Sequence, residues 1–385
     1  MRLTYRYRLY PTKVQEARLN EWLESLRLLY NFALAERRDT YREEKRSVSV
    51  YEQKRALPSL KRRFSRYASI NAQVLQDAIF RLDKAFKRFF EGKGYPRFKA
   101  KERYRSFSYP QSDAFHILEG GKKIRLSKIG KVKLRYHRPL EGTPKTATVT
   151  RYPSGSWYVS ICCELPDVAV EGASLTGFDL GLTNYLTTSD AKVTKPLKVL
   201  KKAERKLRKE QRRLCRKKRG SKNRCKQRRR VARVHEKVAN RRRDFLHKTS
   251  RRVVDSHEGF AFEKLRIRNL LKNHRLAKAI ADAGWSTFVS MMAYKAEKAG
   301  KPFVLVTARG TTQLCSDCGS LIAKSLAQRV HRCPYCGLVL DRDHNAAINI
   351  ASRAGTARSH ACGEATTTDG VSHTQVASVK QETPP

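Results

Sequence analysis

The sequence predicts an α/β protein with two parts: a small β-barrel with helices inserted into it, followed by a core in which short apolar strands alternate with helices. The first observation is a change in hydrophobic period, from helical over 13–90 to a period of two over 106–165. The second is a pair of short apolar strands further on, GFD at 177–179 and GFAFE at 259–263. Since 40% of the residues are hydrophobic, the 385-residue chain can bury real cores, which excludes wholesale disorder.

The charge balance points to a polyanionic partner. The chain has 83 Lys and Arg residues against 35 Asp and Glu, a net charge of +48 and a pI near 10.4. Such self-repulsion opposes compaction and attracts nucleic acid. No run of about 18 uncharged apolar residues occurs, so we expect no membrane span. The start, MRLTYRYRLYPTK, has no apolar core of a secretion signal, so we expect a cytoplasmic protein associated with the nucleoid.

Residues 1–170 are expected to form the first lobe, with strands 1–10 and 106–165 as the barrel and 11–105 as a helical insertion. Residues 1–10 alternate polar and apolar side chains; Pro11 ends the strand and Thr12 suits a helix N-cap. Amphipathic patterns then predict helices over 13–45 and about 70–90. Lys and Arg stand beside aromatic residues on the predicted strands, an arrangement that suits nucleic acid, although a solvated sheet face would look the same.

The most basic segment, 198–248, holds 25 Lys and Arg residues and four acidic ones. A thin apolar stripe at helical spacing, broken at Gly220-Ser221, predicts a helical hairpin over 198–250 with one cationic face. This charge far exceeds what solubility requires, so we expect it to contact a nucleic-acid backbone. Residues 353–385 are rich in Ser, Thr, Ala and Gly and are expected to be disordered.

The cysteine spacing predicts a metal site. Cys315 and Cys318 form one Cys-x-x-Cys pair, and Cys333 and Cys336 form a second, with fourteen residues between the pairs. Four thiolates at this spacing can hold one Zn²⁺ tetrahedrally and leave no open position for a catalytic water, so the predicted zinc is structural. Four unrelated thiols or a redox disulfide pair are the alternatives.

Three acidic residues stand out because they follow or adjoin apolar strands. They are Asp179 in GFDLGLTNYLTT, Glu263 in GFAFEKL and Asp343 in LDRDHNAAINIA. A carboxylate at the end of a buried strand is costly without compensation. Three that converge could hold two Mg²⁺ or Mn²⁺ ions about 3.5–4 Å apart, a pair that promotes phosphodiester hydrolysis.

Each acid has a plainer interpretation as well. Asp179 could bond turn amides, and Asp343 could cap a helix. Asp341 competes with Asp343 for the same role, and we favour Asp343 because it adjoins the helical Asn-Ala-Ala segment.

The chain resembles a known family at these same positions. FDLGLTN, FEKL and DRDHNAAINI, with the cysteines directly before the last, are similar to the split RuvC motifs of the TnpB (OrfB) proteins of insertion sequences. Further similar segments extend the resemblance over residues 1–352: YRLYPTKVQ, INAQVLQDAIFRLDKAFKRFF, GYPRFK, HEKVANRRRDFLHK and AGWSTFVSMMAYKAEKAG.

The resemblance implies an RNase H-like (RuvC) core over 171–352, split by the basic hairpin and by a zinc ribbon at 311–340, and preceded by a wedge and recognition lobe. It implies an RNA-guided DNA endonuclease whose guide RNA derives from the transposon end and whose target is duplex DNA beside a short adjacent motif. Asp179, Glu263 and Asp343 would be the catalytic magnesium ligands. Cys315, Cys318, Cys333 and Cys336 would bind zinc.

Two other functions remain open at this point. One is a transposase that joins DNA strands, because RNase H-like folds also perform strand transfer. The ten histidines contain no His-x-His pair, which argues against tyrosine-nucleophile transposition. The other is a non-cleaving regulator of transposition.

Overall fold

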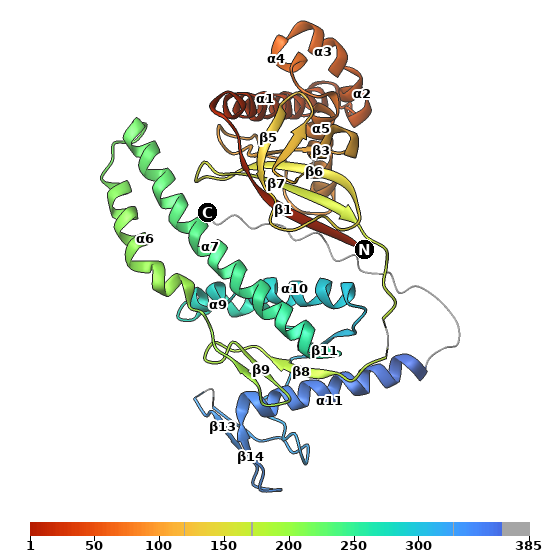
Figure 1. The fold of residues 1–385 in the computed structure, drawn as a ribbon, viewed down its shortest axis with the longest axis vertical. Coiled ribbons are helices and arrows are strands. Elements are labelled where there is room, and N and C mark those ends of the chain that lie inside the picture. Colours follow the sequence, from red (N-terminus) through yellow and green to blue (C-terminus); the bar gives the residue numbers. More distant parts are fainter. Residues whose placement is uncertain (119, 171, 326, 364–385) are drawn as a thin grey trace. The chain divides into compact units, whose positions relative to one another are not determined.

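A computed structural model describes residues 1–363 apart from 119, 171 and 326 (Figure 1). Its contacts divide the chain into two compact units. The first unit comprises Met1–Val168 and Val199–Arg241, and the second comprises Ala169–Lys198 and the chain from Arg242 onward. Most of the basic hairpin therefore packs with the amino-terminal lobe, although its place in the sequence suggested the second part of the chain.

The first unit is built on a seven-stranded antiparallel sheet of order β2-β6-β7-β1-β5-β4-β3. The strands are β1 (Arg2–Tyr10), β2 (Ser106–Tyr109), β3 (Phe115–Ile117), β4 (Lys123–Leu126), β5 (Gly130–Arg135), β6 (Thr143–Arg151) and β7 (Trp157–Glu164). The amino-terminal strand β1 lies in the middle, between β5 and β7. Within the described residues no ladder joins β2 to β3, so backbone hydrogen bonds leave the predicted barrel open between these two strands.

Five helices are inserted between β1 and β2: α1 (Lys13–Glu44), α2 (Val50–Arg55), α3 (Leu57–Arg63), α4 (Ser65–Ala68) and α5 (Ala72–Phe90). The predicted helices at 13–45 and 70–90 are confirmed as α1 and α5. Thr12 caps α1 in a reciprocal capping box with Gln15, and Asn71 caps α5. The helices α2 to α4 were not predicted, because they are too short to show a clear period.

The basic hairpin consists of α6 (Val199–Cys215) and α7 (Lys222–Ser256), which run beside each other in Figure 1. The Gln227 side chain donates to the Glu210 carbonyl at 3.0 Å, and Arg224 donates to the Leu214 carbonyl at 3.0 Å. The break between the helices falls at 216–221, around the predicted Gly220-Ser221. Within the first unit, Arg228 of α7 forms an ion pair with Glu102, which precedes β2.

The second unit contains a five-stranded sheet of order β10-β9-β8-β11-β12. Its strands are β8 (Thr176–Asp179), β9 (Leu186–Thr188), β10 (Val193–Thr194), β11 (Phe260–Glu263) and β12 (Phe303–Val306). The strands β8, β11 and β12 are parallel, while β9 and β10 continue the sheet with antiparallel pairing. The unit also contains α8 (Ile267–Leu270), α9 (Ala277–Ala283), α10 (Trp285–Lys298), β13 (Val330–Arg332), β14 (Val339–Asp341) and α11 (Arg342–Gly363).

Successive side chains of the parallel strands point to opposite faces of the sheet, where each face packs against a separate layer of helices. Phe178 and Phe262 join one apolar cluster, whose other members include residues of α7 and α10. Ala261 lies on the opposite face, in a cluster with Ile350 of α11. Gly177 allows α11 to approach β8 closely, because a Cβ added there would lie 1.9 Å from the Ala347 carbonyl oxygen.

Helix α11 continues to Gly363, past the predicted start of the disordered tail at residue 353. The rest of that predicted tail, 364–385, lies outside the described residues. No helix among the described residues is long and apolar enough to cross a membrane.

Candidate active site and metal centre

Asp179 and Glu263 end neighbouring parallel strands. The register pairs Gly177 with Ala261 and Phe178 with Phe262, so the next residues, the two acids, lie side by side. Asp179 lies two residues after Gly177, and Glu263 two residues after Ala261, so both face the α11 side of the sheet. The carboxyl ends of parallel strands are where α/β sheets bind their ligands.

Asp343 reaches the same place from the first turn of α11. Its Oδ2 atom lies 3.8 Å from the position that a Cβ on Gly181 would occupy, two residues beyond Asp179. Asp341, the competing acid, caps the helix instead: its Oδ1 accepts the Asp343 amide at 2.9 Å and the His344 amide at 3.2 Å.

The three carboxyl groups interact electrostatically. Burial, together with the charges of Glu263 and Asp343, raises the pKa of Asp179 to about 8. Burial also raises the pKa of Glu263, against a hydrogen bond from Thr311 and the charge of Arg353, which lower it. The structure therefore brings together the three acids named from the sequence, and it does so in a setting that disfavours three free negative charges.

Among the described residues, the four cysteines form a group of potential metal ligands whose donor atoms all lie within 4.8 Å of one another, and the three acids do not form such a group.

Three further side chains contact the acids and were not identified from the sequence. The Thr311 hydroxyl donates to Glu263. Arg342 and Arg329 approach Asp343 Oδ1 at 3.4 and 3.8 Å. Arg342 adjoins Asp343 in the chain and could have been noticed, whereas no local pattern marks Thr311 or Arg329.

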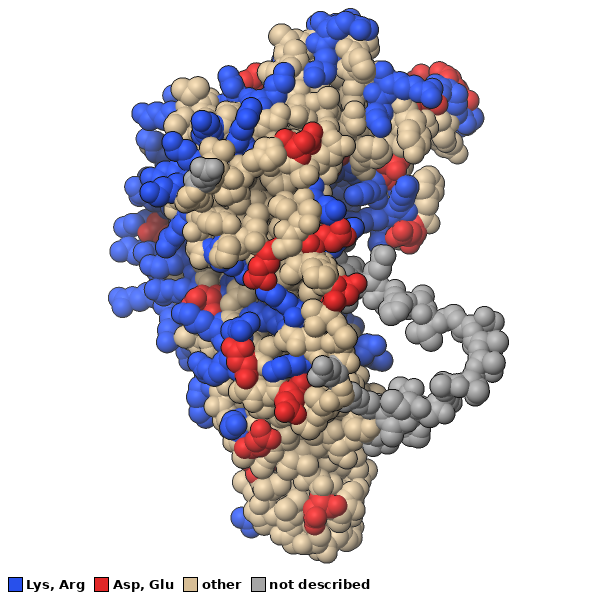
Figure 2. Space-filling view, turned by 45° about the vertical axis from the view of Figure 1, so that its right-hand side comes forward, with Lys and Arg blue, Asp and Glu red and all other residues tan. Residues whose placement is uncertain are grey.

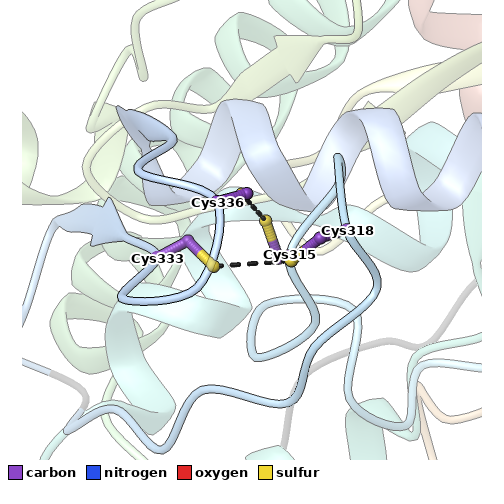
Figure 3. A group of neighbouring side chains, drawn as sticks. All are labelled: Cys315, Cys318, Cys333 and Cys336. Atoms are coloured by element: carbon purple, nitrogen blue, oxygen red, sulfur yellow. Dashed lines mark hydrogen bonds between the residues drawn. The ribbon is translucent and has the colours of Figure 1, made fainter.

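The four cysteines converge as their spacing predicted (Figure 3). The Sγ atoms of Cys315 and Cys336 are 3.6 Å apart, and those of Cys318 and Cys333 are 3.5 Å apart. A tetrahedral Zn²⁺ with bonds of about 2.3 Å would separate its sulfurs by about 3.8 Å, whereas a disulfide requires about 2.0 Å. The donor set and its geometry therefore fit zinc and exclude disulfide pairing in this structure.

Turns and side-chain amides hold this cluster against α11. Gly319 and Gly337, with φ of 72° and 75°, each follow the second cysteine of a pair and allow the tight turn there. The Asn345 side chain accepts from the Ser316 amide at 3.0 Å and donates to the Leu314 carbonyl at 2.7 Å. The helix that carries Asp343 thus also fixes the cysteine ribbon.

Basic side chains outnumber acidic ones on the surface. On the face shown in Figure 2, Lys and Arg side chains (blue) are far more numerous than acidic ones (red). In the hairpin, α6 and the amino-terminal half of α7 expose most of their Lys and Arg residues. This surface fits a polyanion, as the composition indicated.

Comparison with known proteins identifies the family. Family models match at 160–274 ("Probable transposase", OrfB_IS605), at 285–350 ("Cas12f1-like, TNB domain") and at 1–46 ("Helix-turn-helix domain"). A Streptomyces pristinaespiralis protein named "Putative RNA-guided DNA endonuclease" is 39% identical over 98% of this chain and 95% of its own length. The chain belongs to the TnpB (OrfB) family. InsQ of Escherichia coli (strain K12), which carries the same description, is 30% identical over 94% of both chains.

A solved structure shares the fold of this TnpB-family chain. The protein of a Cas12f1–sgRNA–target DNA complex superposes with a TM-score of 0.55 at 16% identity, covering 88% of this chain and 83% of that one. The predicted α/β fold is thus confirmed at the level of a mixed α/β architecture related to Cas12f.

Proposed function

We propose that this protein is an RNA-guided DNA endonuclease that cuts double-stranded DNA beside a short adjacent motif by metal-dependent phosphodiester hydrolysis. The observation that carries the proposal is the meeting of Asp179, Glu263 and Asp343 at the carboxyl ends of β8 and β11. The two full-length relatives described as RNA-guided DNA endonucleases support it. The strand order β10-β9-β8-β11-β12, with three parallel strands, supports an RNase H-like (RuvC) core.

In this proposal the three acids hold Mg²⁺ or Mn²⁺. When bound, two such metal ions would supply an activated water and stabilise the leaving oxygen of the phosphodiester. Asp179 must lose its proton to act as a ligand, and Glu263 is oriented for the task by the Thr311 hydroxyl. Arg342 and Arg329 stabilise the Asp343 carboxylate and leave cationic groups at the edge of the site, where a DNA phosphate can approach.

The cysteine ribbon would hold a structural zinc and has no ligand position left for catalysis. The first unit would act as wedge and recognition lobe for the guide RNA from the transposon end and for the adjacent motif. The basic hairpin would lie along the guide–target heteroduplex and read its backbone, while base pairing selects the sequence. A protein with these partners would work in the cytoplasm, at the nucleoid.

The test is cleavage by the protein purified with its cellular RNA. That RNA is sequenced, and plasmids carrying its complement beside randomised flanks are incubated with the complex and Mg²⁺. We expect linear products, none from Asp179→Ala, and unchanged cleavage from Asp190→Ala, which removes an acid that pairs with His257 instead. Full cleavage by Asp179→Ala would remove that residue from the mechanism.

The same assay separates the two rival functions. Joined DNA strands in place of free ends would identify a transposase, which the description of the matched family model favours. Stable RNA and DNA binding with no Mg²⁺-dependent product at any flank would identify a non-cleaving regulator.

A further inference from the structure

The carboxyl end of α5 combines aromatic and basic residues more densely than a folded lobe requires. Residues 84–99, KAFKRFFEGKGYPRFK, contain five aromatic residues and six Lys and Arg residues against a single Glu. Four of the rings form what we call the α5 aromatic cluster: Phe86, Phe89, Phe90 and Tyr95.

The backbone folds back to build this cluster. Gly92 and Gly94 adopt φ of 81° and 70°, a region that other residues rarely enter. The Tyr95 ring consequently meets Phe86 and Phe89 edge-on, with ring centroids 5.6 and 5.2 Å apart. The rings are therefore arranged before any partner binds.

The inner side of the cluster is anchored, and its outer side is open. Phe86 is half-buried beneath the Arg37 guanidinium, 5.2 Å from its ring centroid. Phe90 is 79% exposed, Tyr95 46% and Phe89 36%. Contiguous exposed rings cost hydration free energy and commonly mark a binding surface.

The charges around the cluster select the chemistry of the partner. Lys87 and Lys93 are 73% and 65% exposed, and Arg88 and Arg97 are exposed as well. Lys87 pairs with Asp83 at 3.4 Å and Lys93 with Glu91 at 3.6 Å. An apolar protein partner would therefore have to desolvate two ion pairs as well as Arg88 and Arg97. A nucleic acid offers phosphates to the cations and flat base faces to the rings.

We propose that the α5 aromatic cluster is a stacking platform for an unpaired nucleobase of bound nucleic acid. Phe90 supplies the outermost ring, Phe89 supports it and is itself packed against Tyr95, and Lys87 and Lys93 contact the flanking phosphates. The inference rests on the proposed binding of nucleic acid, but it does not depend on cleavage.

A tryptophan placed on the platform tests this directly. The three natural tryptophans are Trp22, Trp157 and Trp285, each at most 7% exposed, so Phe90→Trp adds one exposed fluorophore. We expect a single-stranded oligonucleotide to quench that added emission by about half or more. RNA and DNA of one sequence, compared side by side, identify which strand supplies the base. Polyphosphate, a polyanion without bases, should bind without quenching.

The control is Phe32→Trp, because Phe32 of α1 is 61% exposed and lies outside the cluster. Its emission should change little on binding. Undiminished emission from Phe90→Trp at saturating oligonucleotide, with binding verified by anisotropy, would overturn the platform while leaving the proposed nuclease intact. Equal quenching by polyphosphate would overturn it as well.

Truncation gives a second readout. Phe90→Ala should weaken single-strand binding roughly 5- to 150-fold, the range that loss of one base–aromatic stack produces, and Phe90→Tyr should restore it. Because no charge changes, the salt dependence of binding should keep its slope. A changed slope, or no loss of affinity, would contradict the proposal. Failure of the wild-type protein to bind any oligonucleotide would instead contradict the proposed function.

Discussion

Asp179 shows how strongly one residue depends on its surroundings in this protein. An aspartate in water ionises near pH 4, but burial and two neighbouring acids raise the pKa of Asp179 to about 8. A carboxyl group held in this way favours either a proton or a cation. The sequence identified the residue from its position after an apolar strand, but the size of the pKa shift depends first on burial and then on Glu263 and Asp343, which are distant in the chain.

This pKa predicts a pH-dependent stability. Because the folded state holds the Asp179 proton more tightly than the unfolded chain does, the free energy of unfolding without Mg²⁺ should fall as the pH rises from about 4 to about 8. Asn cannot ionise, so Asp179→Asn should melt several degrees above the wild type at pH 8, roughly 2–4 °C for each kcal/mol, and show little gain at pH 4.

Calorimetry in buffers without Mg²⁺ measures this difference. Adding Mg²⁺ at pH 8 should stabilise the wild type and leave Asp179→Asn nearly unchanged, because the variant lacks one ligand. An equal gain at both pH values would mean that the charge of Asp179 is not the cause.

At the scale of elements, an acidic residue anchors the most basic helix. Glu236 is one of only four acids in 198–248, and its side chain is 12% exposed. It accepts hydrogen bonds from the Tyr158 hydroxyl at 2.7 Å and the Ser156 hydroxyl at 3.1 Å, and it pairs with Arg8 at 3.4 Å. These contacts tie α7 to β1 and to the start of β7, so Glu236 offsets a repulsion that would otherwise separate the hairpin from a basic sheet.

We therefore expect Glu236→Gln to loosen the hairpin. A carboxamide keeps one acceptor but places an NH₂ group among the donors, which should cost about 1.5–3 kcal/mol of docking free energy. Amide hydrogen exchange over 222–241 should accelerate. Glu204→Gln, which removes the same charge from the Glu204–Arg208 pair on α6, should not change it. Equal exchange in both variants would show that net charge, and not this contact, governs the hairpin.

On the scale of the whole molecule, the cysteine ribbon and the acid cluster share one helix. Asp343 and Asn345 are neighbours on α11: the former lies at the acid cluster, and the latter holds the loop that carries Cys315. The same helix packs against β8 and β11. Unfolding of the cysteine ribbon should therefore displace α11 and disturb the acid cluster.

Zinc removal tests this connection. Cys333→Ser should lower the zinc content from one per chain towards zero and accelerate amide exchange over 311–341, because structural zinc sites couple metal binding to folding. Cleavage should fall together with zinc. Cys225→Ser, which changes an exposed thiol of the hairpin, is the matched control and should keep its zinc. A Cys333→Ser protein with full zinc content and unchanged melting would contradict the assignment.

Signals local to the sequence were sufficient to predict much of this structure. The hydrophobic period, the capping residues and the charge pattern predicted α1, α5 and the hairpin, and the spacing of the cysteines predicted their cluster. Each of these signals lies within a short stretch of the chain. The three acids could be named because each adjoins an apolar strand. The opening between β2 and β3, the docking of the hairpin through Glu236, and the contacts of Thr311 and Arg329 with the acids were decided only by the tertiary structure. They depend on residues far apart in the chain, and no local pattern records which distant side chain will neutralise a buried charge or which strand will remain at an edge.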